Sequence, residues 1–144
     1  MMTIRMAVET DSENLIAFDH IAHQKDEQDE RREFIRRSVA NGTCFVAEID
    51  GGAVGYGVLN YNFYNSGWVD MLYVRPGYRR HGVGVALLRH METLCRTAKF
   101  FTSTNLSNLP MQSLLNKEGF VLSGVIHNLD EDDPEIVYFK RLAK

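Results

Sequence analysis

Residues 75–91, RPGYRRHGVGVALLRHM, contain three glycines and four arginines. Gly82 and Gly84 stand where an amphipathic helix should begin, although glycine costs roughly 1 kcal/mol relative to alanine inside a helix. The first N–H groups of a helix lack partners within it, and the helix dipole adds partial positive charge there. Glycines let the backbone approach phosphate oxygens, and Arg79 and Arg80 add a positive field. The stretch therefore predicts a site for a diphosphate.

Two common phosphate-binding motifs do not fit this stretch. A P-loop requires Gly-Lys followed by Ser or Thr, which the chain lacks. A dinucleotide fingerprint requires a third glycine three residues after the second, and that residue is Leu87. A turn that only joins a strand to a helix is the simpler alternative.

Helix and strand signals surround this turn on both sides. Helices are expected at about residues 12–22, 27–40, 83–97 and 110–118. Strands are expected at about residues 3–8 and 68–74, on both sides of Asp50-Gly51, at KFFTST, and at FVLSGVIHNL and EIVYFKRL. A further turn is expected at NSG, residues 65–67, and a core-facing stripe is formed by Leu87, Met91, Leu94 and Ala98. The order β-αα-βββ-α-β-α-ββ predicts one α/β (α+β) domain over residues 1–144, with a mixed, mostly antiparallel sheet of about seven strands and helices on both faces.

Bulk composition narrows the class of protein. The chain has 144 residues, 44% hydrophobic and 24% charged, and a net charge of −3, an ordinary balance for one soluble domain that does not favour nucleic acid. No apolar run is long enough for a membrane span, and the N-terminus does not resemble a signal peptide. Cys44 and Cys95 lack metal-type spacing and fit a reducing cytosol. His20 and His23 lack a third ligand, so a cytoplasmic protein without a metal is expected.

Two stretches resemble motifs of the GNAT family of N-acetyltransferases. LYVRPGYRRHGVGVALL resembles motif A, R/Q-x-x-G-x-G/A after a strand that ends in Val, with Val74 as that residue. NLPMQSLLNKEGF, residues 108–120, is similar to motif B, and IRMAVETDSENL resembles the family's opening strand and helix. The resemblance covers nearly the whole chain. It implies the GNAT fold, acetyl-CoA as cosubstrate and transfer of acetyl to an amine.

The resemblance also implies which residues contact the cofactor. The motif A turn binds the CoA pyrophosphate in the family, which maps onto Arg79, Arg80, His81, Gly82, Val83 and Gly84. The preceding strand pairs with the pantetheine arm like an extra strand, which maps onto Leu72, Tyr73 and Val74. The Asn of motif B contacts the cofactor arm, which maps onto Asn108.

Motif B departs from the family at one position. Many members carry a Tyr seven residues after that Asn, as proton donor to the leaving thiolate, and this chain has Leu115. A thiol pKa of about 8.5 makes the thiolate a tolerable leaving group, so activity is compatible with the departure. The alternative donors are Tyr61, Tyr64, Tyr73, Tyr78 and Tyr138.

Asp70 is the first candidate for a catalytic base. Only about one part in a thousand of an alkylamine is neutral at pH 7, so a base should collect the proton. Asp70 is the only acid in WVDMLYV, and the two-residue period puts it on one face with Leu72 and Val74. Some relatives place their base four residues before the strand's final Val, which is Asp70 here. The alternative is an Asp paired structurally with an Arg or a backbone N–H.

The segment HNLDEDDPE, residues 127–135, joins the last two strands with five acids. It is suited to attract a cationic amine, and a solvated hairpin loop is the alternative. The family often takes its acceptor specificity from this region. Glu135, at the strand start, is the best single candidate for substrate binding.

Two functions stay open from the sequence. The first is an acetyl-CoA-dependent N-acetyltransferase that moves acetyl to a small-molecule or exposed protein amine by direct attack on the thioester. The second is a catalytically degenerate CoA-binding sensor or interaction module, which Leu115 favours. Gly82, Gly84 and Asp70 favour the first, and cysteines expected to be buried disfavour an acetyl-cysteine route. The acceptor stays open, as does the oligomeric state, with a homodimer as one outcome because many relatives dimerise.

Overall fold

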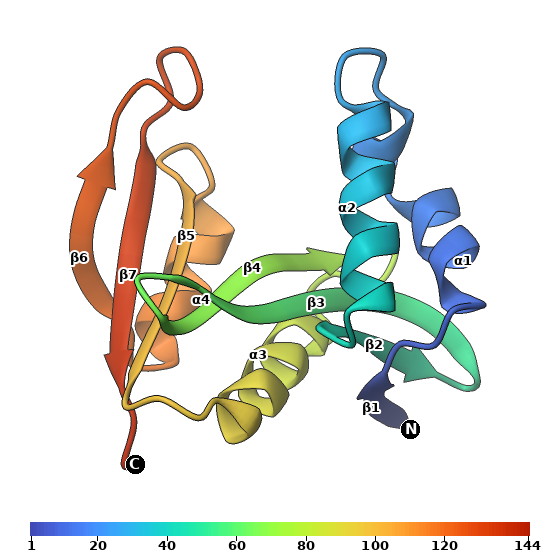
Figure 1. The fold of residues 1–144 in the computed structure, drawn as a ribbon, viewed down its shortest axis with the longest axis horizontal. Coiled ribbons are helices and arrows are strands. Elements are labelled where there is room, and N and C mark those ends of the chain that lie inside the picture. Colours follow the sequence, from blue (N-terminus) through green and yellow to red (C-terminus); the bar gives the residue numbers. More distant parts are fainter. The chain divides into compact units, whose positions relative to one another are not determined.

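The computed structural model describes residues 1–144 and contains seven strands and four helices (Figure 1). The strands are β1 (Met2–Met6), β2 (Cys44–Ile49), β3 (Gly52–Phe63), β4 (Ser66–Val74), β5 (Lys99–Asn105), β6 (Val121–Ile126) and β7 (Glu135–Arg141). The helices are α1 (Asp11–Phe18), α2 (Gln28–Ala40), α3 (Val83–Leu94) and α4 (Leu109–Lys117), with a 3₁₀ turn η1 (His20–His23). The sheet has the strand order β1-β2-β3-β4-β5-β7-β6, and β4 and β5 are parallel. The predicted α+β fold with a mixed seven-stranded sheet is confirmed.

The chain forms two compact units that share strands β3 and β4. The first unit comprises residues 1–59 and 71–93, and the second comprises residues 60–70 and 94–144. No helix in the structure is long and apolar enough to cross a membrane.

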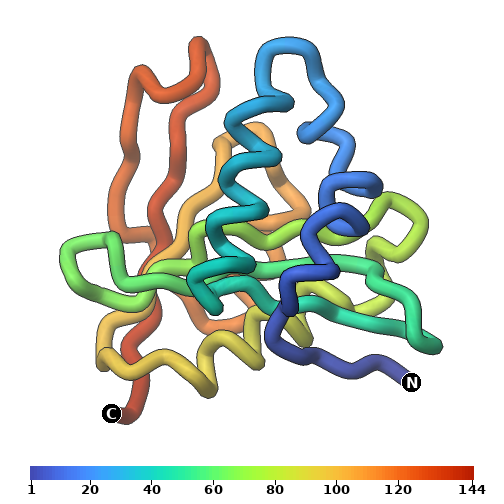
Figure 2. Tube along the Cα trace, turned by 45° about the vertical axis from the view of Figure 1, so that its right-hand side comes forward, coloured from blue at the N-terminus to red at the C-terminus, as the bar shows by residue number.

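In the first unit, α1 and α2 cover one face of the sheet. Strands β2 and β3 form the predicted hairpin at Asp50-Gly51 (Figure 2), and alternate side chains of a strand point to the same face. The buried cluster on this face contains Cys44, Val46, Tyr56 and Val58 from the strands and Leu15, Ile16, Ile35 and Val39 from the helices.

Helix α3 packs on the opposite face, against glycines that alternate with these core residues in β3. A Cβ added to Gly55 would lie 2.8 Å from the carbonyl oxygen of Tyr73 and 3.1 Å from Cγ1 of Val83. A Cβ added to Gly57 would lie 2.6 Å from Cε of Met91. The missing side chains let α3 lie close to the sheet, so in this unit the prediction of helices on both faces is confirmed.

This packing predicts that Gly55→Ala destabilises the protein by about 1–3 kcal/mol, the usual cost of overpacking a core. A backbone oxygen 2.8 Å from the new Cβ cannot move aside by rotating a side chain. Gly52→Ala is the matched control, because its nearest non-neighbouring atom would be the oxygen of Ile49 at 3.7 Å. Urea denaturation measures the free energy of unfolding of both variants. Equal denaturation midpoints for the two variants would contradict the close packing of α3 against β3.

In the second unit, β7 lies between β5 and β6 and pairs antiparallel with both. Leu115 of α4 and Phe100 of β5 are buried, and the Phe100 and Phe120 rings lie 5.6 Å apart. Gly119, with φ 89°, follows the end of α4 as predicted and turns the chain toward β6.

The first helix ends four residues earlier than predicted, at Phe18 instead of Ala22. Asp19 leaves the helical conformation, with φ −79° and ψ 106°. Its carboxylate then accepts hydrogen bonds from the N–H groups of Ile21 and Ala22 and caps η1. A new turn therefore replaces the last turn of the predicted helix.

Helix α3 also ends early, at Leu94 instead of residue 97. Leu94 is 45% exposed, and Ala98 lies outside the helix. The prediction that these two residues belong to the core-facing stripe of the helix is therefore wrong. The buried residues of the helix are Val83, Leu87, Leu88 and Met91. The turn expected at residues 65–67 lies one residue earlier, at Tyr64-Asn65, where both φ angles are positive.

Candidate active site

The turn between β4 and α3 contains the residues predicted to bind pyrophosphate. Arg80 and Gly82 have left-handed φ angles of 67° and 79°, and α3 begins at the next residue, Val83. A Cβ added to Gly82 would meet no atom within 4 Å. The turn therefore presents the first, unpartnered N–H groups of α3 beside open space, which suits an anion.

Arg79 is held in place beside this turn. Its Nε donates to the carbonyl oxygen of Val74 at 3.1 Å, and its guanidinium lies 5.9 Å from the centre of the Tyr73 ring. Arg75 and Arg80 are also exposed in the same turn. Three arginines thus precede the start of α3 in sequence, and contacts to β4 orient one of them, Arg79.

Strand β4 continues beyond its pairing with β5. The parallel register joins Gly67, Trp68 and Val69 to Phe100, Phe101 and Thr102, and the Thr102 hydroxyl donates to the carbonyl oxygen of Val69 at 3.0 Å. The strand then runs on to Val74. The predicted pantetheine contacts, Leu72, Tyr73 and Val74, all lie in this outer part of β4. The backbone groups of a strand that extends past its neighbour can form hydrogen bonds with an extended ligand, which then lies alongside it like an additional strand.

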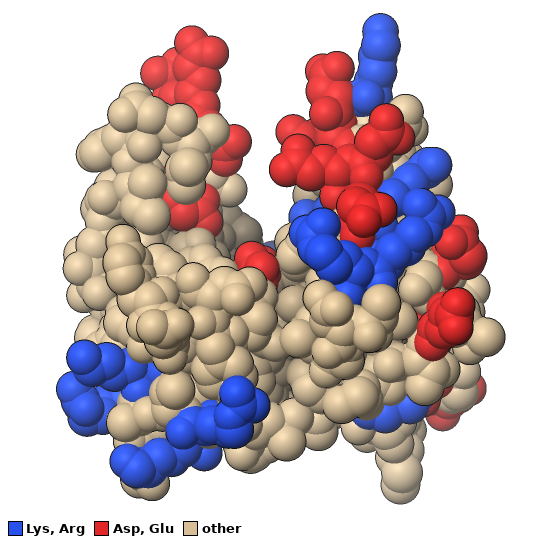
Figure 3. Space-filling view, viewed as in Figure 1, with Lys and Arg blue, Asp and Glu red and all other residues tan.

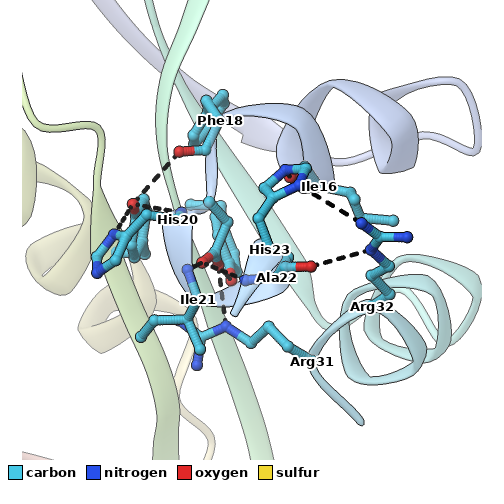
Figure 4. Close-up of polar contacts among 11 residues, drawn as sticks. Ile16, Phe18, His20, Ile21, Ala22, His23, Arg31 and Arg32 are labelled. Atoms are coloured by element: carbon cyan, nitrogen blue, oxygen red, sulfur yellow. Dashed lines mark hydrogen bonds and ion pairs between the residues drawn. The ribbon is translucent and has the colours of Figure 1, made fainter. Parts of the chain in front are cut away.

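The side chain of Tyr73 is part of the buried core and is only 5% exposed. Its hydroxyl lies 2.6 Å from Nδ1 of His20, accepts the His20 backbone N–H at 3.1 Å, and lies 3.3 Å from the carbonyl oxygen of Phe18 (Figure 4). Among the alternative proton donors, Tyr73 is therefore already engaged with η1. Its backbone is the part that the predicted cofactor contact would use.

A buried carboxylate, that of Asp19, connects η1 to α2 and β3 through hydrogen bonds. Asp19 is fully buried and accepts hydrogen bonds from Arg31 Nε at 2.9 Å and from the Tyr56 hydroxyl at 2.5 Å, in addition to those from η1 (Figure 4). Burial, the largest cause, raises the pKa of Tyr56 well above its usual range, so this hydroxyl stays a donor. The sequence did not reveal this network, because its partners are distant along the chain.

Asp70, the predicted base, lies in the second unit and is half-buried. Its Oδ2 accepts a hydrogen bond from Asn60 Nδ2 at 2.9 Å. The partner is a neutral amide, so the carboxylate is not neutralised by an arginine or lysine. Asn60 was not predicted from the sequence. Two strands joined by a short turn pair residues that lie at similar distances from the turn. The turn at Tyr64-Asn65 would therefore have placed Asn60 near Asp70.

Glu135, the predicted acceptor-binding residue, lies at the start of β7. Its Oε2 accepts a hydrogen bond from the Ser103 hydroxyl at 2.6 Å. Both residues belong to the second unit, as does Asp70. Ser103 gave no signal in the sequence, because the pairing of β5 with β7 decides which residues meet.

Acidic side chains gather over the loop between β6 and β7 (Figure 3). Asp130 accepts from Asn105 Nδ2 at 2.8 Å, and Asp133 accepts from the hydroxyl of Ser107 at 2.6 Å. These two acids connect the loop to the segment after β5. Glu131 and Asp132 are exposed, so the loop combines structural acids with acids directed to solvent.

Asn108 caps α4, because its side-chain oxygen accepts the backbone N–H of Met111 at 3.2 Å. The predicted cofactor contact would therefore use the side-chain NH₂ group. Seven residues later, Leu115 is only 1% exposed. No group of three or more metal-binding side chains occurs in the structure.

Comparison with known proteins gives one family. The model of the Acetyltransferase (GNAT) family matches residues 8–120. A GNAT-family acetyltransferase from Bacillus cereus ATCC 10987 is 32% identical, with a TM-score of 0.90 over 100% of this chain and 99% of that chain. Ard1 from Thermoplasma volcanium is 21% identical, with a TM-score of 0.80 and 99% of each chain covered. No curated protein matched.

A further structural neighbour carries the cosubstrate. A Bacillus anthracis str. Ames protein, solved in complex with acetyl coenzyme A, is 21% identical, with a TM-score of 0.63 over 69% of this chain and 61% of that chain. At this identity the likeness shows the fold alone. The family model, by contrast, spans most of the sequence and includes the β4 strand, the glycine-rich turn and α4. The chain therefore belongs to the GNAT acetyltransferase family and is an acetyltransferase.

Proposed function

We propose that this protein transfers the acetyl group of acetyl-CoA to a primary amine, with residues 1–144 acting as a single N-acetyltransferase domain. The main support for the proposal is the order of three structural features along β4 and α3. A strand extends past its parallel neighbour, a left-handed turn with arginines follows, and a helix begins directly after Gly82. These features suit the extended arm and the diphosphate of one CoA molecule.

The individual cofactor contacts in this proposal are those that the resemblance to motifs A and B implies. The N–H groups of the turn and of the start of α3 bind the pyrophosphate, in the segment Arg79, Arg80, His81, Gly82, Val83 and Gly84. The backbone of Leu72, Tyr73 and Val74 pairs with the pantetheine arm. The NH₂ group of Asn108 contacts the arm while the side-chain oxygen caps α4.

Asp70 is the base in this proposal. The amine nitrogen attacks the thioester carbon, the C–S bond breaks and the CoA thiolate leaves. The proton of the amine passes to the carboxylate of Asp70, directly or through water, and the amide product keeps the acetyl group. Support comes from the half-buried position of Asp70 and from its neutral partner, Asn60.

Direct attack fits better than an acetyl-cysteine intermediate. Burial raises the pKa of the Cys44 thiol to about 12, and Cys95 is also buried. A thiol must ionise to be a good nucleophile. Position 115 is Leu where many family members carry the Tyr that donates a proton. In this proposal the thiolate therefore leaves without a protein donor and is protonated by solvent.

The test is release of free CoA thiol from acetyl-CoA across a panel of primary amines and alcohols with matched carbon skeletons. The proposal expects release that depends on an amine and is absent with the matched alcohol. Tight CoA binding in calorimetry without release for any amine would instead favour the CoA-binding sensor or interaction module that Leu115 suggested.

The exposed acids of the β6–β7 loop give a prediction about the acceptor. Glu131→Gln together with Asp132→Asn should raise the acceptor KM by about 2- to 10-fold, since each lost charge pair is worth up to about 1 kcal/mol in water. These acids are chosen because Asp130 and Asp133 also hold the loop together. The acetyl-CoA KM should not change.

The matched control for this prediction is Glu9→Gln with Asp26→Asn, which removes the same charge at exposed positions of the first unit. Steady-state kinetics at two salt concentrations measures both pairs. If the loop pair and the control pair change the acceptor KM equally, the loop is only a solvated hairpin.

A further inference from the structure

Strand β6 forms one edge of the sheet and carries no charge. Residues 120–129, FVLSGVIHNL, contain no Lys, Arg, Asp or Glu. Edge strands of soluble proteins are usually protected by charged residues, proline or irregularity, because their unpaired backbone groups invite another strand. The irregularity in β6 is a register shift between Leu122 and Gly124, and β6 is paired with β7 on both sides of it. The edge is thus largely unprotected.

Four of the six residues of β6 are large and apolar, and their side chains are exposed on both faces of the sheet. Val121 lies opposite Phe139, and Ile126 lies opposite Glu135; these two are 58% and 38% exposed. Leu122 and Val125 are 64% and 47% exposed and lie opposite Tyr138 and Ile136, which point to the other face. Exposed apolar side chains gathered on one edge strand are typical of an interaction site.

The two ends of β6 differ in charge. The register places Lys99 opposite Arg141 and Lys140 opposite Phe100, at the end where β6 begins. At the other end, β6 leads into the acidic loop, residues 130–133. Figure 3 shows these two groups at opposite ends of the strands, with blue atoms near the C-terminus and red atoms over the β6–β7 loop. The uncharged strand therefore runs from a basic end to an acidic end.

We propose that β6 pairs antiparallel with β6 of a second copy of this chain and extends the sheet across a two-fold axis. Antiparallel pairing brings the basic end of one copy next to the acidic end of the other, whereas parallel pairing would bring like charges together. An isologous contact uses the same surface twice, which an uncharged strand with apolar residues on both faces permits. With the axis near Ser123, Leu122 of one copy faces Val125 of the other.

The test is sedimentation velocity over a range of protein concentrations. The wild-type chain should form a dimer, and Leu122→Lys with Val125→Lys should raise its Kd at least 10-fold, because four ammonium groups would meet at the interface. The matched control is Leu106→Lys with Leu109→Lys, at residues 51% and 67% exposed outside β6, which should leave the Kd unchanged. Thermal melting checks that each variant is folded.

Charge reversal tests the antiparallel pairing itself. Leu122→Glu with Val125→Glu should also dissociate the dimer, and mixing the Lys and Glu variants should restore a heterodimer that high salt weakens. A wild-type chain that stays monomeric, a dimer that the β6 variants leave intact, or variants that do not recombine would each overturn the proposal. A monomer that instead binds an added extended peptide along β6 would show that the edge serves a different partner.

Discussion

Replacing Asp70 by Asn is expected to lower kcat/KM by roughly 10²–10⁴, the usual contribution of a positioned acid–base group. Asn keeps the size of the side chain and can still bond with Asn60, so the fold and CoA binding should persist. The loss should shrink as pH rises toward the pKa of the amine, near 10.4, because neutral amine then forms without a base. The measurement is the pH profile of kcat/KM for both proteins.

Asn60→Ala is the control for a structural role of Asp70. It removes the hydrogen bond of 2.9 Å but keeps the carboxylate. If Asp70 acts as the base, this variant should retain most of the rate. If Asp70 only stabilises the strands, both variants should lower the melting temperature equally and show parallel pH profiles, and Asp70 would leave the mechanism.

Gly82→Asp is expected to weaken CoA binding by about 100-fold or more. A carboxylate near a diphosphate costs about 1–4 kcal/mol for each charge pair at 4 Å, depending on the local dielectric constant. The fold should persist, because Asp tolerates the left-handed conformation better than most residues and no atom lies within 4 Å of the new Cβ. Calorimetry with CoA measures the effect.

Two variants separate charge from backbone strain in this experiment. Gly82→Asn has the same shape without the charge and should bind CoA more tightly than Gly82→Asp. Gly77→Asp adds the same charge in the same turn, also with no atom within 4 Å, but outside the R-x-x-G-x-G motif. Wild-type affinity in a folded Gly82→Asp protein, or an equal loss in Gly77→Asp, would show that Gly82 is not beside the pyrophosphate.

The parts of the fold that depend on neighbouring residues were predictable from the sequence. Asp50 and Gly51 both have positive φ angles, as the Asp-Gly dipeptide predicts for a two-residue hairpin. Gly82 and the start of α3 likewise follow from the glycine-rich motif. The strand that contains Asp70 was found from its apolar pattern. Such features are determined within a few residues, so a single sequence reveals them.

The parts that depend on distant partners were not predictable. Asp19 interrupts the expected first helix because its carboxylate finds Arg31 and Tyr56, which lie on other elements. The partners of the proposed site residues, Asn60 for Asp70 and Ser103 for Glu135, depend on strand pairing. No local pattern distinguishes a serine or an asparagine that meets an acid across the sheet from one that faces solvent.

The most direct test of acetyl transfer follows both products of one reaction. The protein is mixed with acetyl-CoA and the amine that releases thiol fastest, and free CoA and acetylated amine are quantified together by mass spectrometry. We expect the two products to appear in equal amounts, with no acetylated protein as an intermediate. Free CoA without acetylated amine, or CoA binding with neither product, would contradict direct transfer from acetyl-CoA to an amine.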